Sequence, residues 1–188
     1  MKKMSIFKRV GGFFLDIVET FVIALAIFVL MYLFLFQPHQ VKGNSMYPNF
    51  HDQEYILTDK ITYRLGQPQR GDVVIFKAPK NEEYDYIKRI IGLPGEKVRV
   101  EDCRVYIDSE PLEEAYLTTE VCTAAGRFWQ SGQNITLAEN EYFVMGDNRP
   151  YSSDSRDWGA VPRLNIIGKA FYRYWPLSQV GLIGSADY

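Results

Sequence analysis

Among the residues that could do covalent chemistry, Ser45 is distinguished by its place in the chain. It lies in the run GNSMYP, residues 43–48, a few residues after a long apolar stretch ends. Serine between glycine and proline is typical of an ordinary turn, because these residue types favour turn backbone. A serine hydroxyl becomes a nucleophile only when a base takes its proton. Ser45 is therefore either a turn residue or a nucleophile, and the choice depends on a base elsewhere in the chain.

Histidine is the usual partner of a nucleophilic serine, and both histidines of the chain, His39 and His51, lie within six residues of Ser45. Proximity in sequence is no indication of geometry, however. His51 stands in the polar run NFHD, which favours a solvated turn, and His39 directly follows the apolar stretch, where we expect an interfacial residue. Neither histidine is our candidate for the base.

Lys88 is the stronger candidate. Its near neighbours include Tyr86, Ile87, Ile90 and Ile91. If the side chain points inward, desolvation disfavours the ammonium form and lowers the pKa, which supplies a neutral amine near pH 7. If it points outward or snorkels to the surface, it is an ordinary solvated lysine. Ser-Lys pairs are a known variant of the catalytic triad, so both orientations of Lys88 stay open at this point.

A third polar segment, GDNRPYSSDSRD at residues 146–157, follows an apolar strand-like run. Its hydroxyls, carboxylates and guanidinium groups suit either a surface loop or a buried polar network in which every group has a partner. Its spacing does not match a calcium-binding loop. Two cysteines and two histidines also leave too few ligands for a tetrahedral His/Cys zinc site. We therefore predict neither a metal nor another cofactor.

The composition limits the class of protein. The chain has 188 residues, 47% of them hydrophobic, which suits one compact domain and an additional element. The net charge of −2, with scattered Lys and Arg, gives no electrostatic footprint for nucleic acid. Cys103 and Cys122 lack CxxC spacing. They are either a disulfide, as an oxidising compartment would allow, or two free thiols.

The long apolar stretch predicts a membrane anchor. Residues 17–36 as a helix would span roughly 30 Å, which matches the hydrocarbon core of a bilayer. A cleaved signal peptide would have a shorter apolar region and a small-x-small cleavage site, and neither is found here. We assign a cytoplasmic tail to residues 1–12, an anchor to 13–37 and an outward domain to 38–188. The excess of Lys and Arg before the anchor supports this orientation.

The pattern of residues 38–188 predicts short strands separated by turns that contain Gly and Pro. Strands are expected at residues 54–58, 73–76, 84–91, 97–100, 104–107, 141–145 and 168–175. These runs are β-branched or alternate between polar and apolar residues, and they are too short for helices. The stretch from about 101 to 140 is largely polar and irregular, and we interpret it as a variable insertion. The prediction is an all-β domain.

Four motifs in this order behind an anchor resemble those of bacterial type I signal peptidases. They are GNSMYP (43–48), RGDVVIF (70–76), YIKRIIGLPGE (86–96) and GDNRPYSSDSR (146–156). The resemblance covers nearly the whole chain and is weakest from about residue 103 to 140. It implies an all-β domain around a coiled antiparallel sheet at the membrane surface. It also implies a membrane-bound serine endopeptidase that removes signal peptides from exported preproteins, on the outer side of the bacterial cell membrane.

The resemblance assigns roles to individual residues. Ser45 would be the nucleophile and Lys88 the general base, while Ser152 would orient the Lys88 amine. Asp154 and Arg156 would form an ion pair that maintains the shape of the loop without entering the chemistry.

Two departures from the family pattern concern the surroundings of Ser45. Some members carry a hydroxyl residue that helps to bind the oxyanion at the position occupied here by Gly43. The oxyanion hole would then depend on the Ser45 backbone N–H, with room provided by Gly43 and a contribution from Asn44. Many members also have Thr-Leu where this chain has Asn49 and Phe50, from which we expect altered packing and retained activity.

The resemblance also implies the binding mode. A signal peptide would lie extended between residues 40–42 and 85–87 and pair with strand edges. Shallow pockets lined by Val41, Met46, Tyr86 and Ile87 would accept small side chains at the first and third positions before the cut. Membrane lipid is the other expected partner, and the sequence does not indicate an oligomeric state.

Two alternatives remain. One is a Ser-Lys autoprotease of the repressor-cleaving kind, which the membrane anchor disfavours because that kind is soluble and carries a DNA-binding segment. The other is a membrane-tethered β-barrel adaptor that binds partners without catalysis and therefore has no need of Lys88.

Overall fold

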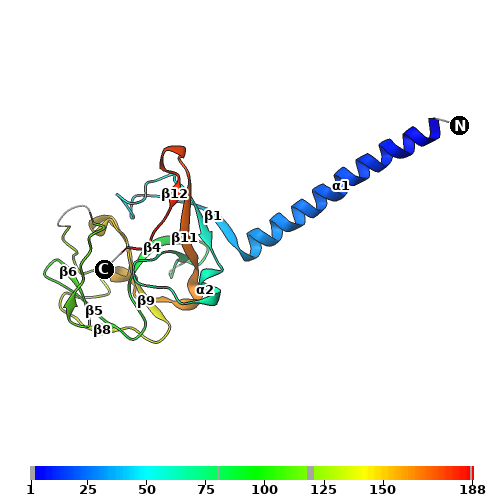
Figure 1. Ribbon diagram of the computed structural model, residues 1–188. Coiled ribbons are helices and arrows are strands. Elements are labelled where there is room, and N and C mark those ends of the chain that lie inside the picture. The colour runs from blue at the N-terminus through cyan, green and yellow to red at the C-terminus, as the bar shows by residue number, and fades with distance from the viewer. Residues whose placement is uncertain (1–2, 80, 118–120, 187) are drawn as a thin grey trace.

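A long N-terminal helix stands away from a β-rich domain (Figure 1). The computed structural model describes residues 3–79, 81–117, 121–186 and 188. Helix α1 covers Lys3–Phe34 and contains an apolar segment of 25 residues, Val10–Phe34, with a mean hydropathy of 2.5. None of this segment is buried against the rest of the chain. A fully exposed apolar helix of this length is suited to crossing a bilayer.

The helix differs at both ends from the expected boundaries. It begins at Lys3 and so includes most of the expected tail, while residues 1–2 lie outside the described part. It ends at Phe34, not at Phe36, because the chain passes directly into strand β1, Phe36–Gln40. This strand pairs antiparallel with β2, Tyr55–Asp59. The apolar pattern alone could not reveal the change, because Leu35 and Phe36 suit a membrane helix and a strand equally well.

The domain is built on two antiparallel sheets, in agreement with the predicted all-β class. The larger sheet has the order β1-β2-β11-β3-β4-β9-β10, and β12 also pairs with β11. Its further strands are β3 (Val73–Lys77), β4 (Asp85–Gly92), β9 (Glu141–Met145), β10 (Val161–Pro162), β11 (Ile166–Trp175) and β12 (Gly181–Leu182). The smaller sheet has the order β7-β6-β5-β8 and consists of β5 (Lys97–Glu101), β6 (Arg104–Ile107), β7 (Glu110–Pro111) and β8 (Ile135–Thr136).

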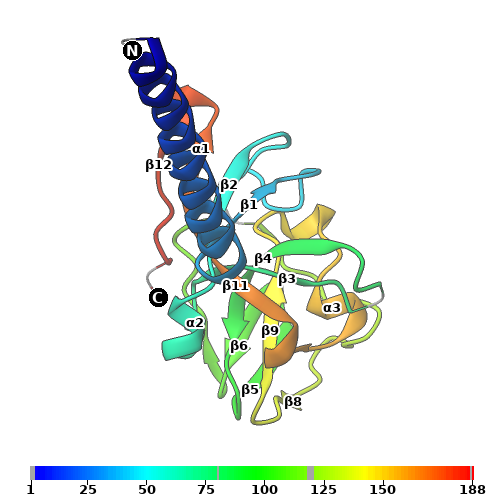
Figure 2. The ribbon, with the colours of Figure 1, turned by 90° about the vertical axis from the view of Figure 1, so that its right-hand side faces the viewer.

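Short helical turns connect several strands. They are α2 (Thr62–Leu65), α3 (Ser155–Trp158) and three 3-10 turns at Arg149–Tyr151, Arg163–Asn165 and Leu177–Gln179. Figure 2 shows α2 beside the domain end of α1, and α3 on the other side of the larger sheet.

All seven expected strands are present, with ends shifted by a few residues. The two-residue strands β7, β8, β10 and β12 were not predicted, because two residues carry no periodic pattern. The stretch from 101 to 140 contains strands β6, β7 and β8 and otherwise irregular chain. Cys103 and Cys122 form a disulfide there, which decides the question that their spacing left open.

The part of the core that supports the site is one buried cluster beneath the turn that contains Ser45. Its members are Val41, Met46, Phe50, Ile56, Val73, Ile75, Ile87 and Ala170. Met46 is only 1% exposed. Burying an apolar side chain of this size stabilises a fold by about 1.5–3 kcal/mol. Met46 and Phe50 therefore anchor the turn between them to the sheet.

Candidate active site

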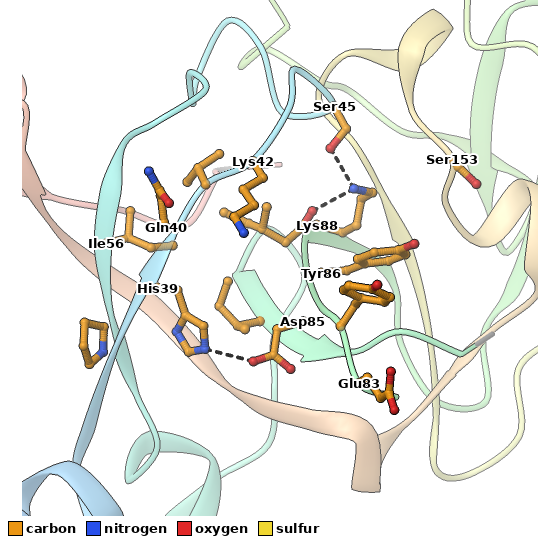
Figure 3. A pocket seen from close by; sticks show the side chains of 15 residues that line it. His39, Gln40, Lys42, Ser45, Ile56, Glu83, Asp85, Tyr86, Lys88 and Ser153 are labelled. Carbon is orange, nitrogen blue, oxygen red and sulfur yellow. Dashed lines mark hydrogen bonds and ion pairs between the residues drawn. The ribbon is translucent and has the colours of Figure 1, made fainter. Parts of the chain in front are cut away.

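Ser45 and Lys88 meet at one end of a groove in the larger sheet (Figure 3). The Lys88 Nζ donates a hydrogen bond to the Ser45 Oγ over 2.8 Å. Ser45 comes from the turn that follows β1, and Lys88 comes from the middle of β4. Of the two orientations that the apolar neighbours of Lys88 left open, the inward one is observed.

The histidines near Ser45 have other partners. His39 Nε2 lies 3.3 Å from an oxygen of Asp85, and its Nδ1 lies 2.9 Å from the Thr58 hydroxyl. His51 Nδ1 lies 3.1 Å from Glu54 Oε1. Lys88 is therefore the basic side chain that is in position to take the Ser45 proton.

The surroundings of Lys88 favour the neutral amine. Its side chain is buried, with only 4% of the residue exposed. Desolvation by this burial lowers the pKa of Lys88 to about 8, although the negative charges of Asp154 and Asp147 oppose the shift. Its Nζ also donates to the Ile87 carbonyl over 2.9 Å, which fixes the direction of the amine. A lysine in this setting holds a lone pair for Ser45 in a substantial fraction of molecules near neutral pH.

The turn that carries Ser45 is held from two sides. Within the turn, the Phe50 N–H donates to the Met46 carbonyl over 2.9 Å. From the loop after β9, the Asn148 N–H donates to the Ser45 carbonyl over 3.0 Å, and the Asn148 side-chain amide donates to the Asn44 carbonyl over 2.9 Å. Asn148 therefore fixes the backbone on both sides of the Ser45 N–H. The sequence motifs indicated no role for this residue.

The expected oxyanion region is formed by residues 43–45. Gly43 has a φ of +81°, a value that glycine adopts without strain, and its surroundings are open. Its N–H donates to Asp52 over 2.7 Å and is therefore already engaged. Within the described part of the chain, the Ser45 N–H has no hydrogen-bond acceptor. The Asn44 N–H likewise has no acceptor among the described residues, so the N–H groups of Asn44 and Ser45 are the two in residues 43–45 that could bind an oxyanion.

Asp154 and Arg156 form a buried ion pair in the loop after β9. The Arg156 Nε lies 2.8 Å from Asp154 Oδ1, and the Gly146 N–H donates to Asp154 Oδ2 over 3.0 Å. One Arg156 nitrogen also donates to the Arg149 carbonyl over 2.7 Å. The pair closes the loop on itself. Asp154 also contributes negative charge near Lys88 without touching the reacting atoms.

Ser152 lies close to Ser45 but does not bond to Lys88. Among the described residues, its buried Oγ has no hydrogen-bond partner. A Cβ placed on Gly146 would come within 2.2 Å of this oxygen and 2.3 Å of the Ser45 carbonyl oxygen. Lys88 instead directs its hydrogen bonds to Ser45 and Ile87. The orienting role of Ser152 therefore stays a prediction, and the absence of a protein partner leaves its hydroxyl available for one.

A second buried ion pair links the elements of the site and was missed by the sequence analysis. Arg89 follows Lys88 in β4 and binds both oxygens of Asp147, over 2.9 and 2.7 Å. The Asn49 amide donates to the same carboxylate over 2.9 Å. Asp147 thus joins β4, the loop after β9 and the turn that carries Ser45. The position of Arg89 beside the candidate base was the one signal in the sequence for this pair.

The insertion also reaches the site through Arg149, which is 1% exposed. One of its nitrogens lies 2.7 Å from Glu114 Oε2 and 2.8 Å from the Thr123 hydroxyl, and the other lies 2.7 Å from the Tyr116 hydroxyl. Glu114, Tyr116 and Thr123 all belong to the segment that the resemblance matches least. The irregular sequence of this segment gave no indication that it would enclose an arginine of the loop.

The groove beside Ser45 has a volume of about 620 Å³ and runs between β1 and β4. Val41, Tyr86 and Ile87 line it, as expected. Met46 does not line it, because its side chain points into the core beneath the groove and packs in the same cluster as Val41 and Ile87. The prediction that Met46 lines a substrate pocket was therefore wrong. In Figure 3 the contact between His39 and Asp85 lies at the opposite end of the groove from Ser45.

Both walls of the groove present strand edges. In the described part of the chain, β1 pairs only with β2. Strand β4 pairs with β3 along residues 85–89, whereas β9 joins its other side only from Arg89 onward. The backbone of residues 85–88 therefore faces the groove without a neighbouring strand. Two such edges, one on each wall, can bind an extended chain between them.

Comparisons with known proteins identify the family of the chain. The profile of the family described as "Signal peptidase, peptidase S26" matches residues 14–175. A protein of Synechocystis sp. named "Probable signal peptidase I-2" is 36% identical over 174 residues, covering 90% of this chain and 77% of the relative. "Signal peptidase IB" of Staphylococcus aureus strain COL is 31% identical over 178 residues, covering 87% of this chain and 92% of the relative.

A crystal structure of a signal peptidase I from Enterococcus faecalis V583 covers 55% of this chain and 97% of its own, with 34% sequence identity and a TM-score of 0.45. The family profile extends from within α1 to the end of β11 and includes both Ser45 and Lys88. The chain therefore belongs to the signal peptidase family, peptidase S26.

Proposed function

We propose that this membrane-anchored serine peptidase removes signal peptides from exported preproteins with Ser45 as nucleophile and Lys88 as general base. The observation that carries the proposal is the 2.8 Å hydrogen bond from the buried Lys88 amine to the Ser45 hydroxyl. Signal-peptide removal follows from membership of the family. The assignment of the two residues rests on this contact, on the lowered pKa of Lys88 and on the adjoining groove.

The geometry supports a two-step hydrolysis. The neutral Lys88 amine takes the Ser45 proton as Oγ attacks the carbonyl carbon of the peptide bond to be cut. The Ser45 N–H donates to the oxyanion that forms, while Gly43 leaves room for it. Lys88 then gives its proton to the leaving amine, and an ester with Ser45 remains. A water molecule, deprotonated by Lys88, releases the signal peptide and regenerates the serine.

The groove accounts for the kind of substrate. An extended signal peptide would place its backbone between β1 and the free edge of β4 at residues 85–88. Val41 and Ile87 form a shallow apolar floor next to Ser45, because both side chains are buried and leave no deep cavity. Small side chains before the cut would fit this floor. Asp85, which contacts His39, lines the groove three residues before Lys88 along β4.

The proposed topology places the N-terminus in the cytoplasm and the β-rich domain on the outer side of a bacterial cell membrane. Lys2, Lys3, Lys8 and Arg9 precede the apolar segment of α1. Basic residues of this kind are retained on the cytoplasmic side. The disulfide between Cys103 and Cys122 suits the oxidising outer side. In this orientation the groove would lie where the signal peptide of an exported chain ends.

The test is the processing of a preprotein by purified full-length variants in detergent. Ser45→Ala removes the nucleophile and Lys88→Ala removes the base, and each is expected to lower the rate by at least about 10³-fold. Ser178→Ala and Lys97→Ala, which change exposed residues, are matched controls and are expected to process at the wild-type rate. Wild-type activity in either dyad variant would refute the assignment.

The same variants separate the two alternative functions. A non-catalytic adaptor would show no processing by the wild type and would not depend on Lys88. A repressor-type autoprotease would cut its own chain and leave an added preprotein intact. Preprotein cleavage that requires both residues is expected only from the proposed function.

A further inference from the structure

Three cations gather around a hollow at the end of the domain nearest to α1. Lys60, Arg64 and Arg163 line a space of about 350 Å³ together with Tyr63, Ile166 and Ile167. Lys60 follows β2, Arg64 lies in α2 and Arg163 begins the 3-10 turn before β11. Three separate segments therefore bring positive charge to one small cavity. The proposed dyad and the groove make no use of it.

Direct contacts place this hollow at the end of the membrane-spanning helix. The Lys60 N–H donates to the Leu35 carbonyl over 2.9 Å, and its Nζ lies 3.5 Å from the Leu33 carbonyl in the last turn of α1. The Arg64 guanidinium lies 5.6 Å from the centre of the Phe34 ring. Figures 1 and 2 both show α2 beside this end of α1. The cations therefore lie where α1 leaves the hydrocarbon core, at the level of the lipid headgroups.

No carboxylate makes direct contact with the cations of the hollow in the described part of the chain, although the more distant Asp85 partly offsets the charge of Lys60. The adjacent Asp59 accepts hydrogen bonds from Ile61 and Thr62 instead. Partial burial, followed by the charge of Arg64, lowers the pKa of Lys60. An anion bound between these side chains would relieve their mutual repulsion.

Two exposed leucines adjoin the cations in sequence. Leu65 follows Arg64 and is 86% exposed, and Leu164 follows Arg163 and is 95% exposed. A free inorganic anion would make no favourable contact with these apolar side chains. Next to a membrane, however, they can contact the acyl chains while the neighbouring arginines bind phosphate.

We propose that the hollow formed by Lys60, Arg64 and Arg163 is a binding site for the phosphate of an anionic phospholipid such as phosphatidylglycerol. The lipid would bring the charge that the cavity lacks and would hold the domain at a fixed height against the bilayer. This inference rests on the membrane anchoring of α1 within the proposed function and is independent of the Ser45–Lys88 dyad.

The test is native mass spectrometry of the full-length protein in detergent, with phosphatidylglycerol or phosphatidylcholine of the same acyl chains added in separate arms. The wild type is expected to retain phosphatidylglycerol in preference to phosphatidylcholine. Each cation near an anionic lipid surface strengthens binding by roughly fivefold. The variant Lys60→Gln/Arg64→Gln/Arg163→Gln is therefore expected to lose the preference and bind phosphatidylglycerol on the order of 100-fold more weakly.

A matched control removes three cations at exposed positions in and near the smaller sheet, as Lys97→Gln/Arg104→Gln/Arg127→Gln. It is expected to keep the preference. Loss of the preference in this control, its retention in the test variant, or its absence from the wild type would overturn the proposal. An adduct with added inorganic phosphate and none with phosphatidylglycerol would also overturn it. Preprotein processing in detergent, measured on the same samples, reports separately on the dyad.

Discussion

At the scale of single residues, the proposed chemistry depends on keeping one lysine neutral beside one serine. Lys88 lies in the part of β4, from Ile87 to Gly92, in which every residue is buried, and desolvation is the largest influence on its pKa. Asp147 and Asp154 counteract this shift. The resulting pKa of about 8 is low enough for a lone pair to be present near neutral pH and high enough for the amine to remain a useful base.

The first prediction at this scale concerns pH. Because only the neutral amine can accept the Ser45 proton, kcat/KM should rise with pH and level off above an apparent pKa near 8, the value for the folded protein. Below that pH, Lys88 is protonated and its lone pair is occupied. The measurement is the rate of preprotein cleavage in detergent across the pH range. A rising limb near 10.5, the ordinary pKa of lysine, would mean that burial does not tune the base.

The second prediction concerns Gly146, which takes no part in the chemistry. In Gly146→Ala, the new Cβ would meet Ser152 Oγ at 2.2 Å and the Ser45 carbonyl oxygen at 2.3 Å. The neighbouring backbone and side chains must shift to make room for this Cβ, which should lower the free energy of unfolding by about 1–3 kcal/mol. The shift should also displace Ser45, so that kcat falls. The control is Gly184→Ala, because nothing lies within 4 Å of a Cβ at that position. Equal kcat and equal thermal stability for the two variants would contradict the packing argument.

The sequence alone predicts the roles of some residues of the site and not those of others. That Ser45 and Lys88 belong together could be predicted from their motifs, whereas the apolar neighbours of Lys88 left both orientations of its side chain open. The roles of Asn49 and Asn148 could not be predicted, because their hydrogen bonds join segments about 100 positions apart. Met46 was placed wrongly, since its residue type suits the floor of a pocket as well as the core beneath it.

At the scale of elements, the loop after β9 is held from outside by the insertion. Glu114, Tyr116 and Thr123 surround the guanidinium of Arg149, and the Ala124 carbonyl accepts from Arg156 over 3.1 Å. The disulfide between Cys103 and Cys122 closes the chain around this segment. The insertion is thus a brace for the loop whose Asn148 holds the Ser45 turn.

A third prediction follows from this brace. Glu114→Ala would leave the buried Arg149 without its carboxylate, and breaking a buried pair costs about 3–5 kcal/mol. Denaturant unfolding of the full-length protein should show a loss of this size, with a lower rate of processing. Glu113→Ala is the control, because it removes the same charge from the neighbouring exposed position. If both variants unfold at the same denaturant concentration, the insertion does not brace the loop.

The elements themselves were largely predictable from the sequence. Strands β3, β4 and β9 carry strong apolar or alternating patterns. Lys88 lies within one of these predicted strands, β4. The exact end of α1 was not predictable, because the pairing of β1 with β2 determines it and the apolar run continues past that point. The architecture of the insertion depends on a disulfide and on contacts with Arg149, neither of which has a local signature.

At the scale of the whole molecule, α1 and the domain meet at a basic and apolar end, and the groove adjoins it. Strand β1 leads directly from α1 to the turn that carries Ser45 and forms one wall of the groove on the way. The apolar helix and Ser45 are therefore separated by a single strand and a short turn. A signal peptide in the bilayer and the proposed lipid at Lys60 would both lie on this side of the domain.

The most direct test of the central claim is the N-terminal sequence of the product formed from a preprotein whose signal ends in Ala-x-Ala. With the purified full-length wild type in detergent, one new N-terminus is expected, directly after the second alanine. No such product is expected with Ser45→Ala. An uncut preprotein, a cut at another position, or the same product from the Ser45→Ala variant would contradict the account.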